Sequence, residues 1–213
     1  MITTVIFDMD GVIFDSERVI FEEWKLIAEK YHLENFEEMY SDCLGSTAAR
    51  VKEIFLSFYG EDIPYDKYRD ERSENYHKKY DGGNLPLKPG IKELLTYLKE
   101  KKYNIIVASS TRSAVVKKQI EDARLSKYFD KIYGGEIAKR SKPFPDIFLE
   151  SVKDSEPDAG KCLVIEDSYN GIRAAKAAGM TAVMIPDMKQ PNEEMKNLAD
   201  YIFETLLDVK SIL

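Results

Sequence analysis

The feature that most constrains the fold of this 213-residue chain is an alternation of short apolar runs with amphipathic segments. Uninterrupted apolar runs of this length are typical of strands buried on both faces of a parallel sheet. Between them, residues such as Ile91, Leu94 and Leu98 are spaced three and four apart, as on one face of a helix. We therefore predict a doubly wound parallel α/β sheet with helices on both faces. The runs lie at residues 5–7, 105–108, 163–165, 182–185 and 201–203, with a weaker candidate at 132–133.

A helical insertion separates the first predicted strand from the others. Residues 15–87 contain no convincing strand pattern, and the spacing of Ile20 and Trp24 begins a helix face. Either Asp15 or Ser16 is placed to cap the N-terminus of this helix. We predict an inserted α-helical cap over residues 15–87, and an α/β core made of residues 1–14 and 88–213.

The last part of this insertion is dense in charge. Residues 66–80 alternate acidic and basic side chains, which is typical of a solvated helix. Its tyrosines are expected on the surface of the cap: Tyr65, Tyr68, Tyr76 and Tyr80.

Polar side chains follow three of the predicted strands at the point where each strand ends. Asp8 follows the first run, Ser109 the second, and Glu166 and Asp167 follow residues 163–165. Asp10 lies two positions after Asp8, so both carboxylates face one space while the chain stays extended. Singly, each residue is equally typical of a polar turn. Together they predict a site, because the carboxyl ends of parallel strands meet at the edge where α/β proteins bind ligands.

Four carboxylates at one edge need a counter-charge, because like charges buried together are costly. The chain has two histidines and two cysteines, none of them in a metal-binding motif. Oxygen ligands alone favour a hard cation, most simply Mg²⁺, among Asp8, Asp10, Glu166 and Asp167. Lys142 is expected to complete the charge balance, and an exposed surface lysine is the alternative.

Composition narrows the class of partner. The chain has 31 Lys and Arg against 38 Asp and Glu, and a net charge of −7 argues against nucleic acid or anionic membranes. No apolar run has the length of a membrane span, and Asp8 interrupts the first run too early for a signal peptide. Cys43 and Cys162 are too few for a disulfide framework. We expect a cytoplasmic protein, most simply a monomer.

Four motifs occur in a fixed order along the chain. They are DMDGV from residue 8, a serine after the second strand at 109, SKPFPD from 141 and EDSYNG from 166. Together they resemble the haloacid dehalogenase-like superfamily, in particular its phosphatase and β-phosphoglucomutase-like branch, which has a Rossmann-like core and a helical cap. The resemblance covers nearly the whole chain. It implies that Asp8 is the nucleophile, Asp10 the general acid and base, Ser109 and Lys142 phosphoryl ligands, Asp167 a metal ligand and Glu166 a residue of the metal site.

The resemblance implies chemistry through an aspartyl-phosphate, which divides one difficult displacement into two. A phosphatase then passes the phosphoryl group to water, whereas a mutase returns it to a sugar hydroxyl. β-Phosphoglucomutases carry a His where this chain has Ile20 and a Lys-Gly pair where it has Leu44-Gly45. We therefore expect a phosphatase acting on a small phosphorylated metabolite, such as a sugar or polyol phosphate, with the mutase as the alternative. Asp10 argues against a dehalogenase, since dehalogenases lack this second Asp.

Candidate substrate-binding residues are Ser110, Arg50 and Arg112. Arg50 follows the Gly45 loop and is placed to reach a distal anion, and a solvated helix arginine is the alternative. Arg112 follows the Ser-Ser-Thr stretch and either faces the site or begins a helix. Trp24 lies on the apolar stripe of its helix, which favours packing within the cap over stacking on a substrate.

A protein of another class, a receiver domain or a catalytically inactive phospho-ligand binder, uses similar residues. Receiver domains place their acidic pair and acceptor Asp on different strands, and no cap follows their first strand. The chain differs on both points. Turnover of p-nitrophenyl phosphate that requires Mg²⁺ and stops with a chelator distinguishes an enzyme from a binding protein.

Overall fold

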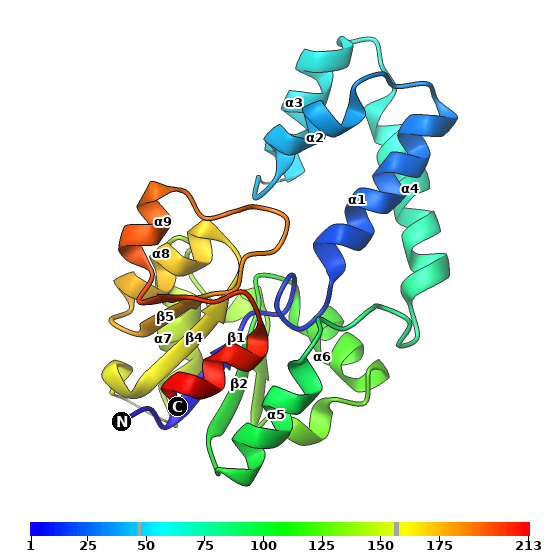
Figure 1. Ribbon diagram of the computed structural model, residues 1–213. Coiled ribbons are helices and arrows are strands. Elements are labelled where there is room, and N and C mark those ends of the chain that lie inside the picture. The colour runs from blue at the N-terminus through cyan, green and yellow to red at the C-terminus, as the bar shows by residue number, and fades with distance from the viewer. Residues whose placement is uncertain (47, 156–157) are drawn as a thin grey trace.

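The core of the structure is one six-stranded sheet in which every pair of neighbouring strands is parallel (Figure 1). The computed structural model describes residues 1–46, 48–155 and 158–213. The strand order β3-β2-β1-β4-β5-β6 shows that the chain starts in the middle, winds to one edge and then crosses to the other. This order confirms the predicted doubly wound sheet. The strands are β1 (Thr4–Phe7), β2 (Asn104–Ala108), β3 (Lys131–Tyr133), β4 (Cys162–Glu166), β5 (Thr181–Met184) and β6 (Tyr201–Ile202).

The central strand β1 is buried on both faces, which explains its unbroken apolar sequence. Ile6 pairs with Ile106 of β2 on one side and with Val164 of β4 on the other. Val5 and Phe7 belong to the hydrophobic cluster on one face of the sheet, and Ile6 belongs to the cluster on the opposite face. Successive side chains of a strand point to opposite faces, so both layers of helices need apolar residues from this strand.

Helices cover the two faces of the sheet in separate layers. One layer contains α5 (Ile91–Glu100), α6 (Ser113–Asp122) and the 3₁₀ segment η4 (Leu206–Ile212). The other contains α7 (Asp146–Val152), α8 (Tyr169–Ala177) and α9 (Glu193–Leu198). Three shorter 3₁₀ turns are η1 (Ser126–Tyr128), η2 (Gly135–Ile137) and η3 (Ala159–Lys161). Within the described residues, no helix has both the length and the apolar character that crossing a membrane requires.

Four helices between β1 and α5 stand apart from the sheet and form a cap beyond one of its edges (Figure 1). They bury a hydrophobic cluster of their own around Trp24, which lies 5.6 Å from Phe55 and 5.7 Å from Tyr65 between ring centroids. Trp24 therefore packs inside the cap, as its place on the apolar stripe predicted. The helices are α1 (Ser16–Lys30), α2 (Phe36–Cys43), α3 (Ala48–Tyr59) and α4 (Tyr65–Tyr80). The exact cap boundaries, 14/15 and 87/88, stay a prediction.

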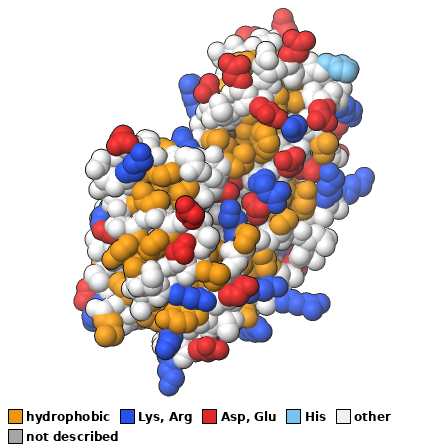
Figure 2. Space-filling model, in the orientation of Figure 1, with side chains coloured by type: hydrophobic (Ala, Val, Ile, Leu, Met, Phe, Trp, Pro, Cys, Tyr) orange, Lys and Arg blue, Asp and Glu red, His pale blue; other side chains and the backbone are white. Residues whose placement is uncertain are grey.

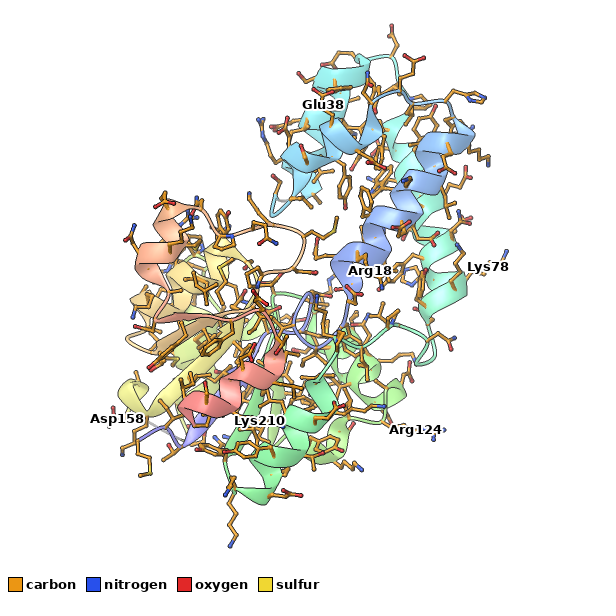
Figure 3. The ribbon with its side chains drawn as sticks, in the orientation of Figure 1. Arg18, Glu38, Lys78, Arg124, Asp158 and Lys210 are labelled. Carbon is orange, nitrogen blue, oxygen red and sulfur yellow. The ribbon has the colours of Figure 1, made fainter. Side chains whose placement is uncertain are left out.

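Helix α4 differs from the prediction for its tyrosines. Tyr65 and Tyr68 are 5% and 7% exposed, so the expectation that they lie on the cap surface is wrong. Tyr68 stacks on Tyr31 of α1 with ring centroids 4.1 Å apart. Tyr65 and Tyr68 are three positions apart on α4 and face α1. Charged residues such as Lys78 lie on the outer side of the helix (Figure 3).

The two chain segments that join cap and core run side by side. Phe14 forms β-bridges with Asp10 and with Leu87. The Asp15 N–H donates to the Pro86 carbonyl over 2.9 Å. The junction between cap and core is therefore bonded directly to the loop that carries Asp10.

The first turn of α1 is not capped by a side chain, in contrast to the prediction. The Asp15 carboxylate instead accepts a 2.7 Å hydrogen bond from Arg18 Nε, and the Ser16 hydroxyl donates to Asp10 over 2.8 Å. Both predicted capping residues are therefore engaged elsewhere. Figure 3 shows Arg18 at the end of α1 nearest the core.

Candidate active site

Three neighbouring strands deliver polar residues to one edge of the sheet, below the cap. Asp8 follows β1, Ser109 follows β2 and Glu166 is the last residue of β4. Strands β2, β1 and β4 are adjacent in the sheet, so these side chains lie close together. All three are buried, at 7%, 1% and 0% exposure. The structure thus brings together residues that are more than 150 positions apart in the sequence.

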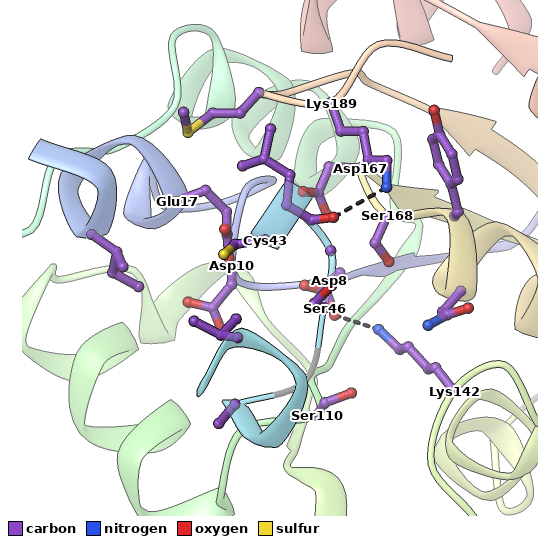
Figure 4. Close-up of a pocket in the computed structure, with 18 of the residues that line it drawn as sticks. Asp8, Asp10, Glu17, Cys43, Ser46, Ser110, Lys142, Asp167, Ser168 and Lys189 are labelled. Atoms are coloured by element: carbon purple, nitrogen blue, oxygen red, sulfur yellow. Dashed lines mark hydrogen bonds and ion pairs between the residues drawn. The ribbon is translucent and has the colours of Figure 1, made fainter. Parts of the chain in front are cut away.

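Lys142 links two of these carboxylates. Its Nζ lies 2.5 Å from Asp8 Oδ1 and 2.5 Å from Glu166 Oε1, and its side chain is only 8% exposed. Figure 4 shows Lys142 pointing to Asp8 from one side of the cavity. Burial would lower the pKa of Lys142, but the Asp8 and Glu166 carboxylates outweigh burial and hold this pKa above its usual range. Lys142 is therefore a buried cation, and the alternative of an exposed surface lysine does not apply.

Glu166 is engaged on both carboxylate oxygens. Oε1 accepts from Lys142, and Oε2 accepts from the Ser168 backbone N–H (2.9 Å) and hydroxyl (2.8 Å). Gly171 leaves the room for this arrangement, because a Cβ there would lie 1.9 Å from the Glu166 carboxyl carbon. Glu166 thus positions Lys142. Both of its oxygens have protein donors, and the metal-site role expected for Glu166 stays a prediction.

Asp10 is held by residues on either side of the cap junction. Its Oδ1 accepts from Ser16 at the start of α1, and its Oδ2 accepts from the Thr111 hydroxyl over 3.0 Å. The Thr111 N–H in turn donates to Ser109 Oγ over 3.1 Å. Two hydroxyl groups therefore fix the orientation of the Asp10 carboxylate near Asp8.

The site carries more negative charge than its lysine can balance. Burial raises the pKa of Asp8 to about 7; Lys142 lowers this pKa, whereas Glu166 and Asp10 raise it. Burial, and then the Glu166 and Asp8 charges, also raise the pKa of Asp167 well above its usual value. Within the described residues, no hydrogen bond engages Asp167 or Asp8 Oδ2. A further cation would stabilise the charged form of these buried carboxylates.

Asp167 lies directly against the turn at Gly11. A Cβ on Gly11 would approach Asp167 Oδ2 to 2.3 Å, and the positive φ of 74° also favours glycine. The carboxylates thus fit a hard cation by charge and donor type. They are not gathered into a preformed metal cluster, since no group of three or more His, Cys, Asp or Glu in the described ranges is arranged to hold an ion.

A cavity of about 820 Å³ lies between the core edge and the cap. The molecular surface is hollowed there, with acidic and basic side chains gathered on its walls (Figure 2). Ser110 lines this cavity, and its role in substrate binding stays a prediction. Arg50 does not, because it lies exposed on α3, where it pairs with Glu53. Arg112 lines a smaller adjoining cavity of about 290 Å³ next to Lys142.

The cap side of the cavity contains residues that the sequence reasoning missed. Glu17 and Arg72 both line it. Burial raises the pKa of Glu17 to about 7, and the Asp10 and Asp187 charges contribute to this rise. A signal for Arg72 did exist, because it continues the spacing of Tyr65 and Tyr68, and an arginine on an aromatic stripe is unusual for a solvated face. Glu17 gave no comparable signal.

The cap loop also contacts the core across the cavity. Lys189 Nζ donates to the Leu44 carbonyl over 3.1 Å, and Figure 4 shows this bond spanning the two parts. Ile20 and Gly45 line the cavity near this bridge. Ile20 and Leu44, aligned with the His and Lys of β-phosphoglucomutases, both line the cavity and are apolar.

Comparison with known proteins places this geometry in context. A family model described as haloacid dehalogenase-like hydrolase matches residues 5–185. The (DL)-glycerol-3-phosphatase 2 of Arabidopsis thaliana is 30% identical over 98% of this chain and 89% of its own length. The phosphorylated carbohydrates phosphatase of Thermotoga maritima is 30% identical over 84% of this chain and 82% of its own length.

Longer relatives and solved structures match as well. The chain spans 54% of a bifunctional riboflavin kinase/FMN phosphatase from Arabidopsis thaliana, to which it is 26% identical. A solved Thermotoga maritima structure, provisionally named a β-phosphoglucomutase, superimposes with a TM-score of 0.80 at 27% identity, covering all of both chains.

Proposed function

Because this chain belongs to the haloacid dehalogenase-like hydrolase family, we propose that it is a Mg²⁺-dependent phosphatase of small phosphorylated metabolites. The observation that carries the proposal is the buried Asp8 carboxylate, held by Lys142 on one oxygen and open to the cavity on the other. A carboxylate in this position is placed to attack phosphorus and form an aspartyl-phosphate.

The groups around Asp8 suit the charge that develops during phosphoryl transfer. Lys142 is a fixed cation at the Asp8 oxygen next to the attacking one, and Ser109 lines the cavity beside it. Such preorganised donors stabilise the oxygens of the transferring group. Lys142 needs no reorganisation at the moment of reaction, because its ion pair with Glu166 fixes its position.

Asp10 is proposed as the general acid and base. It lies two residues from the nucleophile, and Ser16 and Thr111 orient its carboxylate. It would give a proton to the leaving oxygen and later take one from the attacking water. Ser16 begins α1, so one of the two hydroxyl groups that orient this acid belongs to the cap.

Asp8 and Asp167 are the residues that would hold Mg²⁺, with Asp10 adjacent. Their raised pKa values, and the negative charge that Lys142 alone leaves unbalanced, fit that role. The ion, when bound, would offset negative charge on the phosphoryl oxygens.

The named activities of the relatives support a sugar or polyol phosphate as substrate. One is a glycerol-3-phosphatase and another a phosphorylated carbohydrates phosphatase. The cavity offers both polar walls and a volume of about 820 Å³, which suits a small hydroxylated molecule. A phosphosugar mutase is the second candidate, favoured by the structural match with the protein provisionally named a β-phosphoglucomutase. Ile20, which lines the cavity, supports the phosphatase.

A panel of phosphate monoesters tests the proposal, with free phosphate and isomerised product measured in parallel. We expect free phosphate from glycerol 3-phosphate or hexose phosphates, in a reaction that needs Mg²⁺. Conversion of β-glucose 1-phosphate to glucose 6-phosphate without phosphate release would select the mutase. Absence of any turnover across the panel would refute both enzymatic candidates.

A further inference from the structure

The cap side of the cavity holds an arginine without a counter-ion. Arg72 of α4 lines the cavity, and its Nε is buried without a hydrogen-bond partner. No ion pair within the described chain engages it. The Trp24 ring lies 5.6 Å from its Cζ and supports the guanidinium from one side. Burial lowers the pKa of Arg72, but an arginine stays charged in proteins.

Every other cation on the walls of this cavity already has a partner. This contrast among the described lining residues sets Arg72 apart. Lys142 pairs with Asp8 and Glu166, Arg69 with Asp66 and Asp70, Arg173 with Glu194, and Lys189 with the Leu44 carbonyl.

Glu23 is a buried carboxylate whose charge acts on Arg72, yet no hydrogen bond joins the two side chains. Glu23 is 1% exposed on α1, and its Oε1 accepts from Lys79 over 2.8 Å. Its Oε2 has no hydrogen-bond partner, and neither has Arg72 Nε. Glu23 therefore balances part of the charge from a distance but forms no hydrogen bond with the guanidinium, which lines the cavity.

The cap side of the cavity carries two further polar groups besides this arginine. Glu17 lines the cavity near Asp10, and Tyr40 of α2 lines it as well. Tyr40 lies within electrostatic range of both Glu17 and Arg72: apart from burial, Glu17 raises the pKa of its hydroxyl and Arg72 lowers it. Glu17, Tyr40 and Arg72 thus place a carboxylate, a hydroxyl and a cation on the cap side of the cavity.

We propose that Arg72 binds a second anionic group of the substrate, opposite the phosphoryl group that Asp8 attacks. The preferred substrates are then phosphate monoesters whose hydroxylated chain ends in a carboxylate or a second phosphate. A planar guanidinium supported by Trp24 suits the bidentate recognition of either oxyanion. Glu17 and Tyr40 would contact hydroxyl groups between the two ends. The inference rests on the proposed phosphatase function and adds its specificity.

Matched substrates test the inference. Glycerol 3-phosphate against 3-phosphoglycerate varies a terminal carboxylate, and fructose 6-phosphate against fructose 1,6-bisphosphate varies a second phosphate. We expect Arg72→Met to lower kcat/KM for a doubly charged substrate about 10- to 100-fold, the usual effect of losing a hydrogen bond to a charged group, and for its singly charged counterpart less than about threefold. Arg72→Lys should keep part of the preference. Lys78→Met, which removes a charge from the exposed side of α4, should leave both unchanged.

The result that overturns the inference is an equal loss on both members of each pair together with a lower Tm, which would make Arg72 a structural partner of Glu23. Equilibrium binding to the Asp8→Asn variant separates this question from catalysis. There the doubly charged ligand should bind about 10- to 100-fold more tightly with Arg72 than with Met at that position. Equal affinities would refute the inference even if the chain proved to have no phosphatase activity, and unequal affinities would support it in the same case.

Discussion

Gly171→Ala offers a sharp test of the contact that positions Lys142. The new Cβ would lie 1.9 Å from the carboxyl carbon of Glu166, whereas carbon atoms in contact are about 3.5–4.0 Å apart. The Glu166 carboxylate must therefore retreat by about 1.5–2 Å. Its 2.5 Å contact with Lys142 would then lengthen to the limit of an ion pair or beyond.

The magnitude follows from opposing effects. Separating the partners of a buried ion pair costs about 3–5 kcal/mol, and alanine in place of glycine inside a helix returns about 1 kcal/mol. Asp8 still pairs with Lys142, so we expect a net loss of about 2–4 kcal/mol. In a chain of this length that loss lowers the Tm by about 5–15 °C. Misplacement of Lys142 should lower kcat/KM by about 100-fold or more, as removal of one oxyanion donor does.

The assay combines thermal unfolding with turnover of p-nitrophenyl phosphate in the presence of Mg²⁺. Gly160→Ala is the matched control, because a Cβ there meets only Asp158 Oδ1, at 3.2 Å, at the end of the core far from the cap (Figure 3). The control should keep wild-type turnover. Wild-type kcat/KM in Gly171→Ala would refute the claim that Glu166 positions Lys142 for the reaction.

Three further perturbations follow from the site. Chelation with EDTA should abolish turnover, and added Mg²⁺ should restore turnover and raise the Tm, because the ion binds the charged Asp8 and Asp167. Turnover that persists in EDTA contradicts this prediction. Glu17→Gln should become more stable relative to the wild type as pH rises from about 4.5 to 7, by up to about 3 kcal/mol of unfolding free energy. The wild type loses stability over this range because its folded state keeps the Glu17 proton, with a pKa of about 7, after the unfolded chain has lost it. Urea unfolding of both proteins at pH 4 and pH 8 measures the difference, and a parallel pH dependence contradicts it. Ile20→Ala should cost about 1–2 kcal/mol of stability through lost cap packing; a large loss of Mg²⁺ affinity on calorimetry would contradict the placement of Ile20.

The catalytic edge could be predicted from the sequence because its geometry is a property of parallel sheets. Asp8, Ser109 and Glu166 each follow a recognisable apolar run, and strand ends of one sheet share an edge. No knowledge of packing distances was needed to bring them together. The local role of Glu166 was beyond such reasoning, since it depends on the space that Gly171 leaves in the helix after β4.

The cap side of the cavity could not be predicted in the same way. Which cap residues face the core depends on how α1 and α4 are rotated over the sheet, and that rotation is set by packing around Trp24. Arg50 and Arg72 are both arginines in helices of the cap. Arg50 is nevertheless exposed, whereas Arg72 lines the cavity. The many charged residues of α4 predicted a solvated helix. They obscured the stripe formed by Tyr65 and Tyr68, on whose side Arg72 lies.

The most direct test of the account is the identity of the residue that carries the phosphoryl group. The enzyme is mixed with a substrate and Mg²⁺, quenched in acid during turnover, digested and examined by mass spectrometry. We predict one phosphoryl group on the peptide that contains Asp8, and neither the adduct nor turnover in Asp8→Asn. Near wild-type turnover in Asp8→Asn, or a phosphoryl group on another residue, would contradict the assignment of Asp8 as the nucleophile.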